Sequence, residues 1–292
     1  MEIKAQVHNI SKLKDYYFLV PDYQREYVWK MDDQVDQFLA DIANEFEPGA
    51  REQSSYFIGS IIIVKNGDKY DVIDGQQRLT TIVLTMCALR DLLKDQVMDA
   101  RQTQYFQSID HWLSSFDIET NEVQVRLELQ YEESKGFLLQ LIQGPPWSGD
   151  ETASIQRMRE AYVRIKEHLG QYLDAGLEAL TEYARYFLTK IDLVVIESEN
   201  LSSALKIFET INQRGAGLNA MDLVKNLLFS KAKGNEFSRI KEKWKDLTSH
   251  LQRAGEGDSP LRFLRYFLMA RHYEGILRED ELYKWIISPK GR

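Results

Sequence analysis

One segment of this chain combines residue types suited to binding an anion: the sequence YDVIDGQQRLTT, which spans residues 70–81. Its apolar beginning predicts a strand, and the apolar residues that recur at helical spacing after it predict a helix. The Asp-Gly turn between them places free backbone N–H groups and the positive end of a helix dipole beside two glutamines and an arginine. We expect Gly75 to let a ligand approach the backbone closely, and Arg78 to grip a phosphate with two hydrogen bonds.

A structural interpretation of the same turn stays open. In it, Asp74 caps the helix and Arg78 forms a surface ion pair. Gln76 and Gln77 favour the anion site, because glutamines in the first turn of a helix cover no core and are poorer caps than serine or aspartate.

A second segment, Val20–Trp29, gathers aromatic residues, a glutamine and an arginine in a loop that follows the apolar run Tyr17–Leu19. After this loop we expect Asp32 to cap a helix, because apolar residues follow at helical spacing from Val35 to Phe46. The loop therefore connects a short strand to a helix, and its polar side chains are available to a ligand.

Together these segments resemble the N-terminal domain of GmrSD-type modification-dependent restriction enzymes and related phage-defence proteins. That family carries, in order, P-x-Y-Q-R-x-Y-x-W, an F-x-G-S/T strand and D-G-Q-Q-R-L-T-T. The chain has the first at Pro21–Trp29, the second within Tyr56–Ser60 and the third at Asp74–Thr81. A further family element, F-E-x-I-N-x-R-G-x-x-L followed by D-L-x-K-N, is matched from Phe208 to Asn226.

The resemblance implies a ParB/sulfiredoxin-like core that binds and hydrolyses nucleoside triphosphates with Mg²⁺, coupled to an HNH-type nuclease half. The chain contains no G-x-x-x-x-G-K-[ST] sequence, so this activity would not use a P-loop. Sulfiredoxin has a reactive cysteine at the turn where this chain has Gln76, which excludes thiol chemistry there. The five histidines stand in no HNH-like or zinc-binding pattern, so we expect the nuclease half to be truncated or encoded separately.

The predicted site residues are those able to hold a phosphate, a metal-bound water or a base. The catalytic set is Asp74, Gln76, Gln77, Arg78 and Gln24. The nucleotide-binding set is Tyr23, Gln24, Arg25, Tyr27, Gly75, Gln76, Gln77, Arg78, Thr80, Asn212, Arg214 and Lys225.

Each role in these sets follows from the chemistry of phosphoryl transfer, which needs positioning and charge neutralisation. The phosphates are expected to contact the N–H groups of residues 75–77 and the two arginines. One of the three glutamines would orient the attacking water. Asp74 would hold Mg²⁺ through water or cap the helix, and the base would stack on Tyr23, Tyr27 or Trp29.

Two other functions remain possible on the sequence alone. In the first, a non-hydrolysing sensor uses the same pocket to recognise an effector nucleotide or a modified base flipped out of DNA. In the second, the pocket transfers a phosphoryl group to a protein or small molecule, as other members of the wider fold do. The base preference, the modification recognised and the oligomeric state stay open.

The downstream family element also has a structural interpretation. Ala204–Ile211 predicts a helix with Leu205, Phe208 and Ile211 facing inward. The glycines that follow predict a reversal of the chain. A helical corner with stabilising polar contacts therefore stays open beside a contribution of this element to the site.

Hydrophobic periodicity predicts an α+β fold with two regions. Residues 1–98 alternate short strands and helices, with an Asn-Gly hairpin turn at 66–67, and form the small mixed-sheet core. Residues 99–292 are mainly helical, and we expect them to contribute the strand 191–196 and the helix-loop-helix 201–230 to the site.

Charge limits the partners of the chain. It has 292 residues, of which 45 are acidic and 37 basic, which gives a net charge of −8. Because an acidic surface repels nucleic acid, we expect DNA to be bound only through the nuclease partner. Between Lys231 and Lys245 basic residues alternate with acidic ones, which favours a solvated helix face over the alternative, a DNA-binding face.

Composition also indicates a compartment. Cys87 is the single cysteine and lies among apolar residues of a predicted helix, so we expect it in the core. The N-terminal residues are polar, and no apolar run approaches the ~18 residues that a membrane span needs. We therefore expect a soluble cytoplasmic protein.

Overall fold

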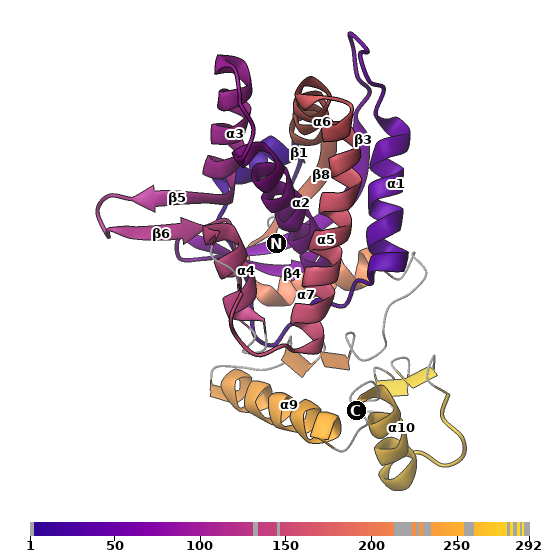
Figure 1. Cartoon of the computed structure of the whole chain (residues 1–292). Coiled ribbons are helices and arrows are strands. Elements are labelled where there is room, and N and C mark those ends of the chain that lie inside the picture. The colour runs from indigo at the N-terminus through magenta and orange to yellow at the C-terminus, as the bar shows by residue number, and fades with distance from the viewer. Residues whose placement is uncertain are drawn as a thin grey trace. The chain divides into compact units, whose positions relative to one another are not determined.

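The structure is a computed structural model of the chain. It describes residues 3–130, 134–144, 147–212, 224–225, 228–229, 235–253, 260–278, 281–282, 285–286 and 288. The chain divides into two compact units, Met1–Glu199 and Asn200–Arg292 (Figure 1). The division after residue 98 that the periodicity suggests lies inside the first unit and stays a prediction.

The first unit is built on a six-stranded mixed sheet with the strand order β1-β8-β3-β4-β2-β7. Its strands are β1 (Ile3–Asn9), β2 (Phe18–Val20), β3 (Tyr56–Asn66), β4 (Lys69–Asp74), β7 (Leu127–Leu129) and β8 (Ile191–Ser198). β8 pairs parallel to β3 and antiparallel to β1, so the predicted strand at 191–196 does rejoin the N-terminal sheet. The expected α+β class is confirmed.

β3 and β4 form the expected hairpin. They pair antiparallel from Ile62 and Asp74 to Asn66 and Lys69, and Gly67 in the turn has a φ of 62°. β2 then pairs parallel to β4 on the other side. The hairpin delivers the end of β4 to the middle of the sheet, where the helix of the DGQQR segment begins.

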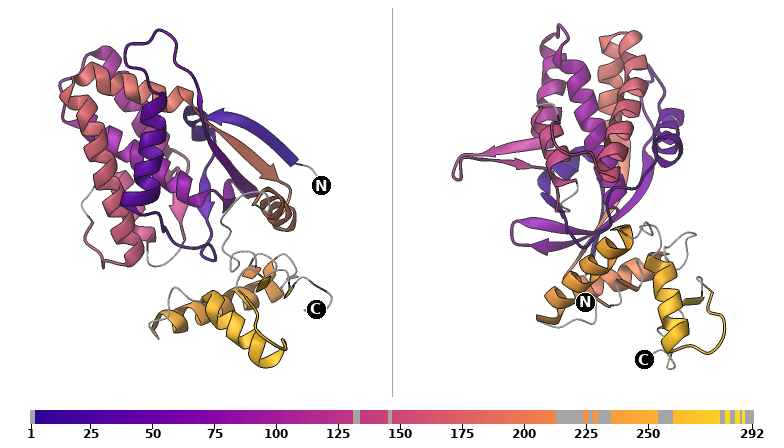
Figure 2. Two further views of the ribbon diagram at one scale, coloured as in Figure 1. Left: turned by 90° about the vertical axis from the view of Figure 1, so that its right-hand side faces the viewer. Right: turned by 60° about the horizontal axis from the view of Figure 1, so that its bottom comes forward.

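Helices pack on one face of this sheet, as the two views in Figure 2 show for the first unit. They are the short helical segments Ile10–Asp15 and Met31–Val35, and α1 (Asp36–Glu45), α2 (Gln76–Lys94), α3 (Ala100–Leu113), α4 (Lys135–Gln143), α5 (Ala153–Asp174) and α6 (Leu177–Lys190). A separate hairpin of β5 (Ser114–Asp117) and β6 (Glu122–Val125) projects from the unit (Figure 1).

α2 is the central helix of the first unit. Most of its apolar residues are fully buried, among them Leu79, Ile82, Val83 and Leu89. Cys87 is fully buried too, as expected, and burial raises the pKa of its thiol to about 12. Because α2 is enclosed along most of its length, its first turn is held firmly against the sheet.

The helix after the loop begins earlier than the sequence indicates. Its first turn, Met31–Val35, follows Lys30, which occupies the cap position, and no side chain caps it. The prediction that Asp32 is the cap is therefore wrong. The acidic residue lies inside the first turn, where its charge still interacts favourably with the helix dipole. The predicted apolar face of this helix, from Val35 to Phe46, is buried as expected.

The second unit contains the helices α7 (Leu201–Asn212), α9 (Asn235–Arg253) and α10 (Pro260–Arg271). Leu205 and Phe208 of α7 are buried as predicted, but Ile211 is 42% exposed, so the prediction that it faces inward is wrong. In α9 the exposed residues include both acids and bases, which fits the predicted solvated face. Among the residues described, no helix is long and apolar enough to cross a membrane.

Gly75 is required where β4 passes into α2. It precedes the first turn of the helix with a φ of 86°, in the left-handed region. A Cβ on this residue would lie 2.5 Å from Cγ2 and 3.1 Å from Cα of Ile61. Gly75 is therefore required by its contact with β3, and its expected role in letting a ligand approach the backbone stays a prediction.

We expect Gly75→Ala to lower the free energy of unfolding by about 2–5 kcal/mol, from left-handed strain together with overpacking. Gly67→Ala is the matched control, because Gly67 also has a positive φ but no atom within 4 Å of its Cβ position. It should cost only about 1–2 kcal/mol. Urea denaturation of both variants tests this, and equal losses would show that the Ile61 contact does not constrain the turn.

Candidate functional site

Three of the segments singled out by the sequence meet at the first turn of α2. The side-chain amide of Gln77 joins the first of them to this turn. Its Nε2 donates to the carbonyl of Glu26, and its Oε1 accepts from the N–H of Val28, both at 2.8 Å. Gln77 is 6% exposed, so these two bonds tie the loop before α1 to the helix in a largely dry environment.

Arg78 joins the second segment to the turn. Its Nη1 donates to the carbonyl of Ser60 at 2.8 Å. A Cβ on Gly59, which has a φ of 109°, would lie 2.8 Å from Nη2 of Arg78. The pairing of β3 with β8 is irregular between Phe57 and Ser60, so a break in the ladder coincides with this contact. The strand is therefore shaped to accept the guanidinium.

The charge of Arg78 is held in a partly buried place. Burial lowers the pKa of the guanidinium, and the negative charge of Asp74 acts in the opposite direction. Apart from its bond to Ser60, no other hydrogen bond of this side chain occurs among the described residues. The remaining N–H groups of the fork are the part of Arg78 that can bind an anion.

Gln76 differs from its neighbour. It is 7% exposed, and its Oε1 is buried without a hydrogen-bond partner among the described residues. A buried acceptor without a partner costs about 1–3 kcal/mol, so such an atom in a folded protein calls for an explanation. The two adjacent glutamines look equivalent in the sequence but differ in the structure. Gln77 holds the loop through two hydrogen bonds, and Gln76 has an acceptor without a hydrogen-bond partner among the described residues.

The start of α2 also presents uncapped backbone donors. The residue at the cap position is Gly75, no side chain caps the helix, and the backbone bond from Leu79 N–H to Gly75 closes the first turn. The predicted cap, Asp74, is thus not the cap residue. The N–H groups of residues 76–78 precede the helical hydrogen bonds, which leaves them for an anion.

The loop Pro21–Trp29 is attached to this turn at several points. Gln24 Nε2 donates to the carbonyl of Ile73 at 3.2 Å, directly before the turn. Tyr27 is 1% exposed, and its hydroxyl lies 2.9 Å from Oγ1 of Thr81 in a hydrogen bond. The ring of Tyr27 is therefore part of the core, and the expectation that a base stacks on it is not supported.

The other aromatic residues of the loop remain partly accessible. Tyr23 and Trp29 are each partly exposed, and Arg25 is exposed. Burial, followed by the charges of Asp71 and Asp22, raises the pKa of Tyr23, so this phenol stays neutral. Tyr23 and Trp29 are thus the aromatic residues of this loop that a ligand can reach.

The predicted residues of the downstream element lie in the second unit or outside the described residues. Asn212 ends α7, and its side chain is not described. Arg214 lies outside the described residues, and Lys225 is 4% exposed. Their contribution to the site stays a prediction. In the first unit, Thr80 is 1% exposed, which places it inside the core rather than on the surface of the turn.

Two functional positions were not assigned a role by sequence reasoning. Gly59 and Ser60 belong to a segment that the motif comparison had identified, but the contact of both residues with Arg78 was not predicted. A glycine inside an apolar strand was the available signal, because it commonly marks a bulge or a close approach. Within the described residues, no group of three or more histidine, cysteine or acidic side chains could hold a metal ion.

The fold and this site define an α+β domain in which a strand-to-helix turn, a β-bulge and a polar loop surround one helix N-terminus. A model of the family described as "GmrSD restriction endonuclease, N-terminal domain" matches residues 7–229. The chain belongs to this family, as its motifs had indicated. No curated protein matches the chain at a significant level.

Because the two glutamines differ in their hydrogen bonds, we expect their substitution to change the free energy of unfolding differently. We expect Gln77→Met to lower the free energy of unfolding by about 1–3 kcal/mol, because Val28 N–H and the Glu26 carbonyl lose their partner. Gln76→Met keeps a similar side-chain volume and removes an acceptor that has no hydrogen-bond partner among the described residues. This change should leave the free energy of unfolding unchanged or raise it. Urea denaturation of both variants checks this, and the reverse order would contradict the assignment.

Proposed function

We propose that this chain is the nucleoside-triphosphate-binding and hydrolysing regulatory module of a modification-dependent restriction or phage-defence enzyme. The observation that carries the proposal is the buried, unpartnered Oε1 of Gln76 in the same helical turn as three uncapped N–H groups and Arg78. This combination offers donors to a phosphate and an acceptor to a water molecule, which are the two requirements of phosphoryl transfer to water.

In this proposal the phosphates are bound at the start of α2. The N–H groups of residues 76–78 and the free part of the Arg78 fork supply donors, and the helix dipole adds a favourable potential. Arg25 is exposed on the attached loop and supplies a second cation. Partial burial strengthens these contacts, because the surrounding dielectric is lower than that of water.

Gln76 is the residue that orients the attacking water. Its Oε1 can accept a hydrogen bond from that water, whereas both amide atoms of Gln77 are already bonded to the loop. Gln24 is also less suited, because its Nε2 is bonded to the Ile73 carbonyl. We therefore assign Gln77 and Gln24 to positioning the loop.

Mg²⁺ would be held by Asp74 together with phosphate oxygens and water, which is how this ion is commonly bound in nucleotide sites. The base would lie against Tyr23 or Trp29, the partly exposed aromatic residues of the loop. DNA would be bound through an HNH-type nuclease partner, and a cytoplasmic location belongs to the same proposal.

A non-hydrolysing sensor is the second candidate. A sensor needs the donors and the aromatic residues but no metal and no oriented water. Measured turnover separates the two candidates.

Binding is tested with Arg78→Lys, which keeps the charge and removes the fork. We expect the affinity for a magnesium nucleoside triphosphate to fall at least tenfold, since a fork's charge-assisted bonds are worth about 1.5–3 kcal/mol each. Arg159→Lys on α5, whose arginine pairs with Glu151, is the matched control and should not change affinity. Calorimetry with all four triphosphates decides, and unchanged affinity in Arg78→Lys would place the site elsewhere.

Turnover is tested with Gln76→Met. Triphosphate affinity should stay within a few-fold, while phosphate release should slow by at least about tenfold, because an oriented water matters mainly in the transition state. Gln77→Met should affect phosphate release only indirectly, by weakening the attachment of the loop to the first turn of α2. Equal losses of binding and release in Gln76→Met would contradict the role in turnover. Absence of phosphate release by the unaltered chain would favour the sensor.

A further inference from the structure

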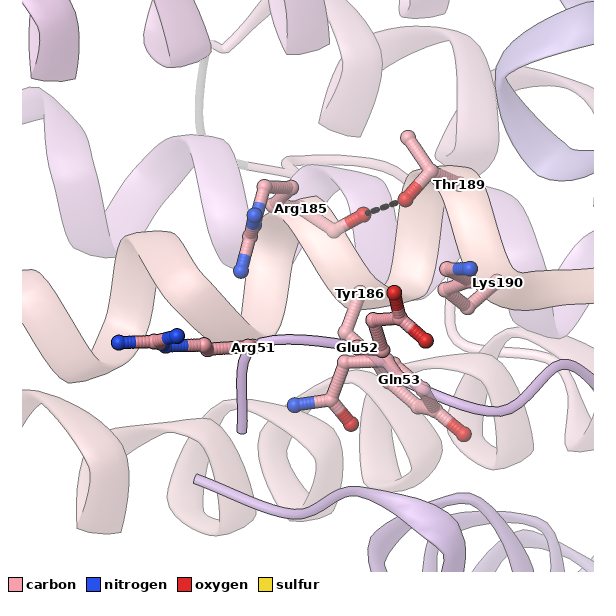
Figure 3. Close-up of a pocket in the computed structure, with 7 residues that line it drawn as sticks. All are labelled: Arg51, Glu52, Gln53, Arg185, Tyr186, Thr189 and Lys190. Atoms are coloured by element: carbon pink, nitrogen blue, oxygen red, sulfur yellow. Dashed lines mark hydrogen bonds between the residues drawn. The ribbon is translucent and has the colours of Figure 1, made fainter. Parts of the chain in front are cut away.

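We propose that the first unit carries a second anion site, separate from the first turn of α2, that binds a small phosphorylated ligand through its phosphate group. The site is a pocket of about 340 Å³ between α6 and the loop that precedes β3 (Figure 3). Its lining residues are Arg51, Glu52, Gln53, Arg185, Tyr186, Thr189 and Lys190. None of these lining residues belongs to a motif of the family.

The charge of the pocket is the first argument. Its lining contains three cations and one carboxylate, in a chain whose acidic residues outnumber its basic ones by 45 to 37. Arg101, Arg159 and Arg164 of the same unit each pair with a carboxylate. Among the described residues, by contrast, none of the three pocket cations forms an ion pair. The pocket is therefore a local site of net positive charge, in which its one carboxylate, Glu52, is outnumbered by three cations.

The arrangement of the charges indicates where an anion sits. Figure 3 shows the guanidinium groups of Arg51 and Arg185 on one side of the pocket, and the side chains of Glu52 and Lys190 on the other. Glu52 lowers the potential near Lys190, so the two arginines are the stronger anion-binding pair. Two guanidinium groups from different elements can bind separate oxygens of one phosphate.

The walls of the pocket are held in place before any ligand binds. Gln53 closes the loop by accepting from the N–H of Glu47 and donating to its carbonyl. The N–H of Gly49 donates to Oε1 of Glu182 on α6 at 2.8 Å, which anchors the loop to the opposite wall. Because the loop and α6 are joined, less conformational freedom is lost on binding than for a mobile loop.

Tyr186 forms an aromatic part of the pocket wall. It is 1% exposed, it lines the pocket, and its hydroxyl finds no hydrogen-bond partner among the described residues. Burial, with the nearby charge of Glu45, raises the pKa of Tyr186 to about 12, so the hydroxyl keeps its proton. Figure 3 shows this hydroxyl directed away from the two guanidinium groups, so Tyr186 contributes to the pocket with its ring.

The size and charge of the pocket define the class of ligand. A volume of about 340 Å³ is at the lower end of ordinary small-molecule sites, and the pocket is small compared with the extended basic surface that duplex DNA needs. The overall charge of −8 also opposes a long polyanion. A single phosphate group, free or carried by a small molecule such as a nucleotide, therefore fits best.

The test is calorimetry on the whole chain in a phosphate-free buffer of low chloride, with inorganic phosphate, a nucleoside 5′-monophosphate and the parent nucleoside. Each titration is repeated in the Arg78→Lys variant, so that binding at the first turn of α2 is recognised. We expect phosphate and the monophosphate to bind and the nucleoside not to bind. Tighter binding of the monophosphate would identify an organic ligand, and equal binding would identify phosphate itself; both support the site.

Arg51→Glu and Arg185→Glu should each weaken phosphate binding at least tenfold, and Arg185→Lys should weaken it less. Arg239→Glu on α9 is the matched control, because it makes the same change of charge at an exposed helical arginine and should have no effect. Binding that Arg185→Glu leaves unchanged, or absence of binding up to about 10 mM phosphate, would overturn the proposal. If phosphate binding is lost in Arg78→Lys but in none of the pocket variants, phosphate binds at the first turn of α2. That result would overturn the second site and would agree with the proposed function.

Discussion

The two hydrogen bonds of the Gln77 amide to the backbone at Glu26 and Val28 are the interaction on which the rest of the site depends. They attach a loop without regular structure to the first turn of a buried helix, and the loop's own bond to the Ile73 carbonyl then completes the attachment. A side-chain amide is suited to this task because it offers one donor and one acceptor in a fixed geometry. The attached loop carries Arg25, Tyr23 and Trp29.

Two glycines determine how closely the sheet and helix approach each other. Gly75 lets the turn lie against Ile61, and Gly59 leaves the space that the guanidinium of Arg78 occupies. Both have a positive φ, so each position excludes side chains for a conformational and a steric reason. As a result Arg78 is held by the strand in a partly buried place, where its charge interacts more strongly with a ligand than it would at the surface.

The two proposed anion sites differ in their physical design. At the first turn of α2, one partly buried guanidinium acts with backbone donors, and its pKa is lowered by burial. At the pocket beside α6, the exposed Arg51 on the loop and the exposed Arg185 on the helix act together, and hydrogen bonds hold that loop to the helix. The first arrangement favours charge that develops during a reaction, because its donors are fixed and partly dry. The second favours reversible binding that salt weakens.

The sequence alone determined the α+β class, the hairpin at Asn66–Gly67, the central buried helix and the family, because these follow from periodicity, turn chemistry and motifs of adjacent residues. It missed β1, whose apolar residues Ile3 and Val7 are 45% and 65% exposed. This strand is held by backbone bonds to β8, which is distant in the sequence, rather than by burial of its side chains. Tertiary structure alone separated Gln76 from Gln77 and placed Tyr27 in the core. Such roles depend on partners distant in sequence, such as Val28, Thr81 and Ser60, and local patterns carry no information about them.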